Sequence, residues 1–371
     1  MLTVNPVTNK ADRDTFIKFP WIIYSGDSRW VPPLLIERKE FLDEKKNPFF
    51  EFATVQHYLA RKDGKVVGRI SAIDDKKYND FHQVKNVGFG LFESVDDVEV
   101  SRALFAKVAE WGQTRGLENV WGPVSFSTNH ECGLLVDGFD DMPAVMMSYN
   151  PTYYAKLIED AGFAKARDLW AWHLPATAAV PEKVGRIAEK IREREGIVVR
   201  SARMDKWEEE LDLAFSIYNE SWEKNWGFVP FSKKEFYKLG NEMKMIVKPD
   251  LVLIAEVKGE VAGFSFTIPD VNPAQAKANG RLLPFGLIKM LLAMKKCKRV
   301  RLVLLGMRPG FRKRGIDAIL YKDTLTNAAK LGFTQGEIGW TLDNNAMVNR
   351  AIESMGGKKS KTYRVYEKAV A

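Results

Sequence analysis

The chain has 371 residues, 46% hydrophobic and 28% charged, which is typical of a folded globular protein and excludes a disordered or fibrous one. Its length favours two domains. The net charge of +8 suits a phosphorylated cofactor, a nucleic acid or an anionic membrane surface about equally. Two cysteines exclude a disulfide framework, and four scattered histidines form no zinc signature, so we expect no metal.

The N-terminal segment is too polar for a secretory signal, and no apolar run approaches the ~18 residues of a spanning helix. We therefore expect a soluble, cytoplasmic protein. The basic residues stand in short clusters without an RNA-recognition or helix-turn-helix signature, so we expect no nucleic-acid partner.

The first half of the chain alternates strands and helices. GKVVGRISAIDD (64–75) predicts a β-hairpin with its turn at the leading glycine. VGFGLFES (87–94) predicts a strand, and the helical pattern after it ends at Gly116, a glycine C-cap. NPTYYAKLIEDAG (150–162) predicts a further helix.

The second half repeats these elements in the same order. GEVAGFSFTIPD (259–270), VLLGMRPG (303–310) and NNAMVNRAIESMG (344–356) match the three segments, and Gly332 matches the helix-ending glycine. LPATAAVPEK (174–183), rich in alanine and proline, predicts a linker between the copies.

The spacing between matched segments grows from about 195 to about 216 residues and then returns to about 194. The first copy therefore has about 22 extra residues between 116 and 150, and the second has about 21 between 270 and 303. We predict two tandem domains of mixed α/β class with a mixed sheet, over residues 1–175 and 190–371.

LGMRPGFRKRGIDAILY (305–321) places basic residues around glycines between a predicted strand and a predicted helix. A glycine turn that opens a helix aims unpaired N–H groups outward, and the helix dipole adds positive potential. Arg312 and Arg314 could then bind a pyrophosphate, with Lys313 or Arg308 near a further phosphate. A solvated basic turn is the alternative, and a P-loop is excluded because its glycine-lysine motif is absent.

The second copy resembles the GCN5-related N-acetyltransferase (GNAT) superfamily, and the repeat extends the resemblance to the first copy. The family signature Arg/Gln-x-x-Gly-x-Gly/Ala matches the stretch from Arg312, with Asp317 departing at the sixth position. Asn345 and Gly356 resemble the family's strand-to-helix motif beside the pantetheine arm. The family's tyrosine general acid would stand at Ile352, so that acid is missing from its usual place.

The resemblance implies an N-acyltransferase that uses acetyl-CoA or a longer acyl-CoA as donor and a small or lipid-like amine as acceptor. It implies that a backbone N–H near Met307 polarises the thioester carbonyl. It places the cofactor against Leu305, Gly306, Met307, Arg312, Lys313, Arg314, Gly315, Ile316, Asn345 and Asn349. Because of Ile352 and Asp317, a non-catalytic acyl-CoA-binding module is the alternative.

The first copy carries FESVDDVEV (92–100) where the second has its basic loop. These residues include four carboxylates and no glycine, and carboxylates repel a pyrophosphate at ranges of a few ångströms. We expect the first copy to be degenerate and only the second to bind the cofactor.

Candidate proton-transfer groups occur in both copies. GEIGWTLDN (336–344) offers Glu337 and Asp343, although Glu337 could be an exposed strand carboxylate. TNHECGLL (128–135) offers His130 and Glu131, and a covalent route through the neighbouring Cys132 is disfavoured because adjacent residues rarely face each other in a strand.

Two segments bear on the acceptor. The aromatic segment 218–231, with Trp222 and Trp226, either covers the acceptor or belongs to the core. LLPFGLIKMLLAM (282–294), followed by KKCKR, is too short to span a bilayer. It could wall a fatty acyl chain, pack as a core helix, or place residues 282–299 on the inner face of a membrane as a peripheral contact. This favours long-chain acylation of a lipid-like amine such as a sphingoid base.

Overall fold

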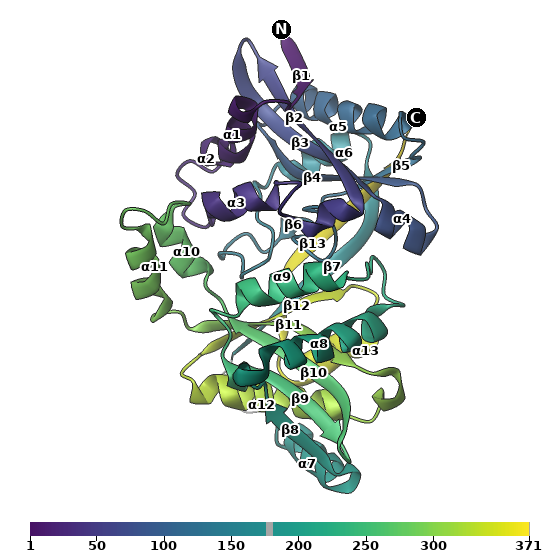
Figure 1. Cartoon of the computed structure of the whole chain (residues 1–371), viewed down its shortest axis with the longest axis vertical. Helices are drawn as coiled ribbons and strands as arrows, with labels where there is room; N and C mark the ends of the chain where they lie inside the picture. Colours follow the sequence, from purple (N-terminus) through teal and green to yellow (C-terminus); the bar gives the residue numbers. More distant parts are fainter. Residues whose placement is uncertain (176–180, 371) are drawn as a thin grey trace. The chain divides into compact units, whose positions relative to one another are not determined.

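The computed structural model describes residues 1–175 and 181–370 (Figure 1). The chain forms two compact units. Unit 1 consists of Met1–Leu169, Asn272–Leu292 and Lys361–Ala371, and unit 2 of Trp170–Val271 and Ala293–Ser360. Both units combine helices with a mixed sheet, so the predicted mixed α/β class is confirmed.

The strands of unit 1 follow the order β1-β2-β3-β4-β5-β13, and β6 also pairs with β13. The β4–β5 pair is parallel, and its register runs from Asn86↔Asn119 to Gly88↔Trp121. The strands are β1 (Leu2–Pro6), β2 (Ala53–Lys62), β3 (Lys65–Asp75), β4 (Asn86–Ser94), β5 (Asn119–Gly122), β6 (Leu134–Asp137) and β13 (Lys358–Ala369). The helices are α1 (Lys10–Lys18), α2 (Pro20–Ile23), α3 (Leu35–Phe41), α4 (Lys76–His82), α5 (Val98–Gln113), α6 (Tyr154–Asp160), α10 (Asn272–Ala278) and most of α11 (Gly286–Met294).

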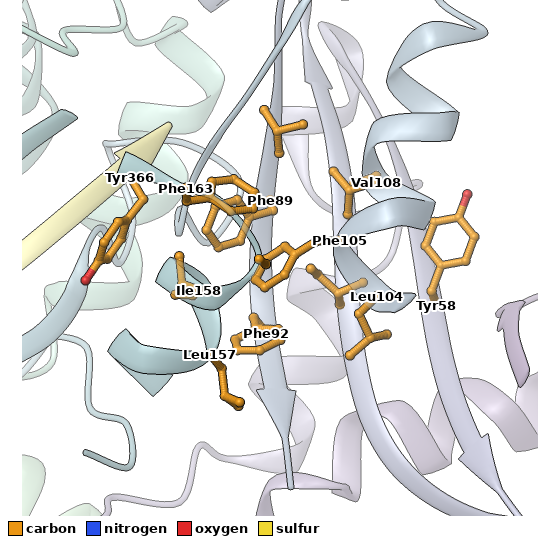
Figure 2. Close-up of a cluster of buried hydrophobic side chains, with 14 of the residues drawn as sticks. Tyr58, Phe89, Phe92, Leu104, Phe105, Val108, Leu157, Ile158, Phe163 and Tyr366 are labelled. Atoms are coloured by element: carbon orange, nitrogen blue, oxygen red, sulfur yellow. The ribbon is translucent and has the colours of Figure 1, made fainter. Parts of the chain in front are cut away.

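The core of unit 1 lies between its sheet and helices α5 and α6. Figure 2 shows Leu104, Phe105 and Val108 of α5 facing the strand that carries Phe89 and Phe92. The three α5 positions are spaced as one face of a helix, and Gly68 of β3 leaves room for that face, because a Cβ there would come within 2.8 Å of Leu104 Cδ1. This core holds β4 firmly at the point where its second half leaves β5.

Unit 2 follows the order β7-β12-β11-β10-β9-β8. Its strands are β7 (Ala164–Pro175, which begins in unit 1), β8 (Ile197–Ser201), β9 (Val252–Val257), β10 (Glu260–Pro269), β11 (Arg299–Met307) and β12 (Gln335–Leu342). Its helices are α7 (Glu182–Glu195), α8 (Trp207–Trp222), α9 (Lys233–Met243), α12 (Ile316–Lys330) and α13 (Ala346–Ser354).

The repeated glycine motifs form the predicted hairpin turns. Asp63 and Gly64 join β2 to β3 with φ angles of 51° and 79°, and Lys258 and Gly259 join β9 to β10 with 52° and 82°. Two successive left-handed residues suit the twist of a tight hairpin, and glycine adopts that conformation without a Cβ clash.

Two segments of the second copy belong to unit 1. Strand β13 pairs with β5, with Tyr366 opposite Gly122. Helix α10 is tied to unit 1 at its end, where Leu35 N–H donates to the Gly280 carbonyl over 2.9 Å. The units therefore exchange segments relative to the expected boundaries of 1–175 and 190–371, and part of the expected linker, 176–180, lies outside the described residues.

The alternative that residues 282–294 form a core helix is wrong. Helix α11 has no buried residue, and its large apolar side chains face solvent. No helix in residues 1–175 or 181–370 is long and apolar enough to cross a membrane.

Candidate functional site

Strands β11 and β12 of unit 2 pair only over their first halves. Their parallel register runs from Arg299↔Gln335 to Leu302↔Ile338, whereas β11 continues to Met307 and β12 to Leu342. The strands diverge beyond the last pair, and the edge of β11 that faced β12 loses its neighbour there. Backbone groups on such an edge need partners, so it can bind an extended ligand by main-chain hydrogen bonds.

The basic loop joins this edge to the start of α12, as predicted. Gly315 is the N-cap residue in the left-handed conformation, with φ of 78°. A Cβ there would come within 2.5 Å of Ile191 Cδ1, so close packing also requires glycine. The first N–H groups of α12 have no intrahelical partner, and with the helix dipole they form a site suited to phosphate.

The arginines of the loop are engaged within unit 2. Arg312 donates to the carbonyl of Ser221 over 2.8 Å, at the C-terminal end of α8. Arg314 is paired with Glu195 of α7. Lys313 is exposed, and the described residues place no hydrogen bond or ion pair on its ammonium group. Of the three basic residues, Lys313 is thus the one whose charge is free to meet a ligand in this conformation.

Asn345 and Asn349 hold the turn after β12. Asn345 caps α13 by accepting from Val348 N–H over 3.4 Å. Asn349 is buried and donates to the Leu342 carbonyl over 3.0 Å. Ile352, at the position of the family's tyrosine, is completely buried. The asparagines therefore fix where α13 begins relative to the free edge of β12.

An aromatic cluster covers β11. A Cβ on Gly306 would come within 2.4 Å of the Trp222 ring, so this glycine lets the indole lie on the strand. Trp222 stacks on Tyr218 with ring centroids 5.0 Å apart, and Tyr218 also contacts Phe228 and Phe231. The segment is largely core, and the half-exposed Trp222 is its member next to the divergent strand.

Glu337 is 3% exposed, so the alternative of an exposed strand carboxylate is wrong. The register sets it beside Arg301, which is equally buried and donates to the Gly339 carbonyl over 2.9 Å. Asp343 is half-buried just beyond the end of β12. A carboxylate beside a buried guanidinium has a structural role, and this leaves Asp343 as the better candidate for proton transfer in unit 2.

The corresponding helix of unit 1 is closed by its own side chains. Asp97 caps α5 by accepting from Glu99 N–H over 2.9 Å. Lys62 donates to both carboxylates over 2.9 Å, and its hydrogen bond to Asp97 lowers the pKa of that carboxyl group. A carboxylate therefore occupies the place where unit 2 has a free helix terminus.

His130, Glu131 and Cys132 lie in unit 1. The ring of His130 is within 3.1 Å of Ser127 Oγ through Nδ1 and packs edge-on against Phe41. Cys132 is buried, and burial raises the pKa of its thiol to about 12. A neutral thiol is a poor nucleophile, which agrees with the disfavoured covalent route.

Tyr321 of α12 escaped the sequence analysis. It is buried in one apolar cluster with Ile338 and Ile352, so its side chain lies near the position of the missing family tyrosine. Burial, and secondarily the charge of Asp317, raises the pKa of its phenol, which therefore stays protonated. Tyr321 stands four residues after Asp317 in the helix that follows the glycine turn, and this spacing is the feature of the sequence that could have identified it.

Among residues 1–175 and 181–370, no group of three or more His, Cys, Asp and Glu side chains is placed to hold a metal ion.

No protein-family model matches the chain. The chain is 37% identical over 379 residues to the bacterial ceramide synthase of Caulobacter vibrioides (strain NA1000 / CB15N), covering 100% of this chain and 98% of that protein. It belongs to the bacterial ceramide synthase family.

Further comparisons give a second relative and the fold. Protein YghO of Escherichia coli (strain K12) is 34% identical, with 99% of this chain and 95% of that protein covered. A tandem GNAT protein from the clavulanic acid biosynthesis pathway has the same fold, with a TM-score of 0.60, 10% identity and coverage of 100% and 99%. A GCN5-related N-acetyltransferase from Sphaerobacter thermophilus gives 0.54 and 13% identity, with 100% and 96% covered. The chain has the tandem GNAT fold.

Proposed function

We propose that the protein transfers a long acyl group from an acyl-CoA to the amine of a sphingoid-like base. The Caulobacter relative is named a bacterial ceramide synthase, and this supports the acceptor class. The observation that carries the donor assignment is the free edge of β11 leading directly into the uncapped start of α12. A pantetheine arm can pair along that edge while the pyrophosphate meets the helix N-terminus and Lys313.

The chemistry needs three proton and charge steps. The ammonium of the acceptor loses a proton to Asp343, and the neutral amine attacks the thioester carbon. Backbone N–H groups of β11 near Met307 stabilise the oxyanion. The C–S bond breaks, and the CoA thiolate receives the second proton of the attacking nitrogen, passed on through the hydroxyl of Tyr321, which burial keeps protonated before and after the step.

The acyl chain has an apolar site within unit 2. A cavity of about 70 Å³ lies between α8, α9 and the sheet, with Leu304 of β11, Phe264 and Leu211 in its wall. Each buried methylene contributes about 0.8 kcal/mol, so even partial entry of a chain favours longer donors. This cavity replaces the 282–294 segment as the proposed acyl site, because that segment packs in unit 1.

Helix α11 suits peripheral contact with an anionic membrane on the cytoplasmic side. Ile288 and Leu292, one turn apart, are 55% and 60% exposed. The exposed Lys289 lies on the same helix, and Lys295 and Lys296 follow it directly in the chain. Exposed apolar side chains followed along the chain by exposed lysines match the acyl boundary and the charged headgroups of such a surface.

Vesicle sedimentation tests this contact. We expect binding to phosphatidylglycerol vesicles in preference to phosphatidylcholine vesicles, and loss of binding in the Ile288→Gln, Leu292→Gln double variant without a change in Tm. The exposed Met347 of unit 2 offers a control, Met347→Gln. A wild-type protein that ignores both vesicles, or that forms dimers through α11, would contradict the assignment.

Transfer itself is tested by release of CoA thiol with acetyl-, octanoyl- and palmitoyl-CoA and a sphingoid base, with mass spectrometry of the product. We expect an N-acyl product and the highest kcat/KM with palmitoyl-CoA. Tight binding of acyl-CoA without turnover on any amine would instead favour the acyl-CoA-binding module. If acetyl-CoA proved the best donor, the apolar cavity would not be the site of the acyl chain.

A further inference from the structure

Unit 1 contains a cavity of about 330 Å³ that the proposed reaction does not use. Its wall includes Leu91, Phe92 and Glu93 from the second half of β4, and Ser125 and Glu131 from the segment after β5. The β4–β5 pairing ends at Gly88, so the cavity opens where these strands diverge. By the internal repeat, this is the first copy's counterpart of the free edge in unit 2.

The floor of the cavity is a network of buried polar side chains that are hydrogen-bonded to one another. The Glu93 carboxylate accepts from the hydroxyls of Tyr24 and Tyr154 over 2.9 and 2.8 Å, and Arg69 lies 3.4 Å away. Arg69 in turn donates to the Phe16 carbonyl over 2.7 Å. These residues are largely hydrogen-bonded to one another, so they shape the cavity and are less available to bind a ligand.

Arg38 differs from this network. It lines the same cavity with its side chain only 12% exposed, and its Nε forms an ion pair with Glu37 Oε2 at 3.7 Å but makes no hydrogen bond within the described residues. Although burial opposes it, the charges of Glu37 and Glu131 raise the pKa of Arg38, which stays charged. A buried, incompletely bonded guanidinium is costly, and a ligand oxygen would relieve that cost.

The balance of charge favours a cation as well. The lining has three carboxylates, on Glu37, Glu93 and Glu131, against the two guanidiniums of Arg38 and Arg69. Tyr24 and Trp30 are stacked at 4.7 Å in the wall, and aromatic faces attract ammonium groups. This excess of carboxylate repels a pyrophosphate, so the cavity does not suit a second CoA.

The extra segment of the second copy closes this cavity. Asn272 and Gln275 of α10 line it and donate to the carbonyls of Pro143 and Pro32 over 2.8 and 3.2 Å. Within a short connection, α10 leads to α11 and its exposed apolar side chains. One unit thus presents a polar chamber and, along the same segment, an apolar surface.

We propose that unit 1 selects the acceptor before the reaction, by binding the headgroup of a single-chain amino alcohol in this cavity with the ammonium at Glu131, the hydroxyls at Arg38 and the hydrocarbon chain directed to α11. The amine reaches Asp343 only after it leaves this cavity. The inference rests on the proposed function, because such an amphiphile is the proposed acceptor. It makes the degenerate copy the unit that selects the amine.

Titration calorimetry without acyl-CoA tests the site. The probe is a water-soluble 2-amino-1,3-diol with a hexyl chain, and its N-acetyl derivative is the uncharged comparison. We expect the amine to bind at least tenfold more tightly than the derivative. Glu131→Gln should weaken the amine about tenfold or more and leave the derivative unchanged, as expected for loss of a charge-assisted bond.

Arg38→Gln should weaken both probes, because both keep their hydroxyls. Glu118→Gln removes an exposed carboxylate of the same unit and should change neither affinity. Equal affinity of the two probes for the wild type, or an unchanged amine affinity in Glu131→Gln, overturns the site.

Turnover separates this inference from the proposed function. Selective binding of the amine without acylation would refute the reaction and keep the site. Acylation with the same acceptor KM in wild type and Glu131→Gln would refute the site and keep the reaction.

Discussion

A single loop position can test electrostatic binding of the donor. Gly310 lies in the basic loop with an ordinary backbone conformation, and a Cβ there would meet nothing within 4 Å. Gly310→Glu therefore adds a negative charge without strain, and Gly310→Gln adds nearly the same shape without charge. At ~7 Å and an effective dielectric constant of ~40, each phosphate charge is repelled by about 1.2 kcal/mol.

Two pyrophosphate charges then give about 2.4 kcal/mol, which corresponds to a loss of about fiftyfold in affinity. We expect calorimetry with CoA to show this loss for Gly310→Glu at low salt and a smaller one at high salt, because salt screens exposed charges. Gly310→Gln should bind within about twofold of the wild type, with both Tm values unchanged. Equal affinities for the Glu and Gln variants would refute a pyrophosphate at this helix terminus.

Three further outcomes follow from the buried polar groups. Glu337→Gln should lower the unfolding free energy by about 3 kcal/mol in denaturant titrations, because it leaves the Arg301 charge buried and uncompensated; an unchanged stability would show that no such pair exists. Tyr321→Phe should lower kcat at least tenfold with little change in the Kd for acyl-CoA, and an unaffected kcat would exclude it as the acid. Burial raises the pKa of Glu93 above its ordinary 4.5, so the protonated side chain stabilises the folded protein at low pH. This contribution to the unfolding free energy is lost as pH rises through the pKa of the folded state. Glu93→Gln should abolish this decline, and Tm values measured from pH 4 to pH 8 that fall equally in both proteins would contradict it.

The sequence by itself determined the repeat, the fold class and the position of the basic loop. Each depends on local rules that hold wherever the segment packs. Gly64 and Gly315 have positive φ because those turns demand it, and the periodicity of α5 exposes one apolar face. The family resemblance rested on the same local motif and was confirmed by the comparisons. The absence of glycine in 92–100 likewise anticipated that α5 is closed by its own Asp97.

Only the tertiary structure decided which charges are available and which elements meet. Arg312 and Arg314 look equivalent to Lys313 in the sequence, but α8 and α7 happen to present a carbonyl and a carboxylate to them. The 272–292 segment packs in unit 1 because its partners, such as the Leu35 N–H, are some 240 residues away in the chain. Long-range pairing of this kind leaves no periodic signal, since any exposed donor could have satisfied the same carbonyl. The divergence of β11 from β12, and with it the site, arises in the same way from packing between distant segments.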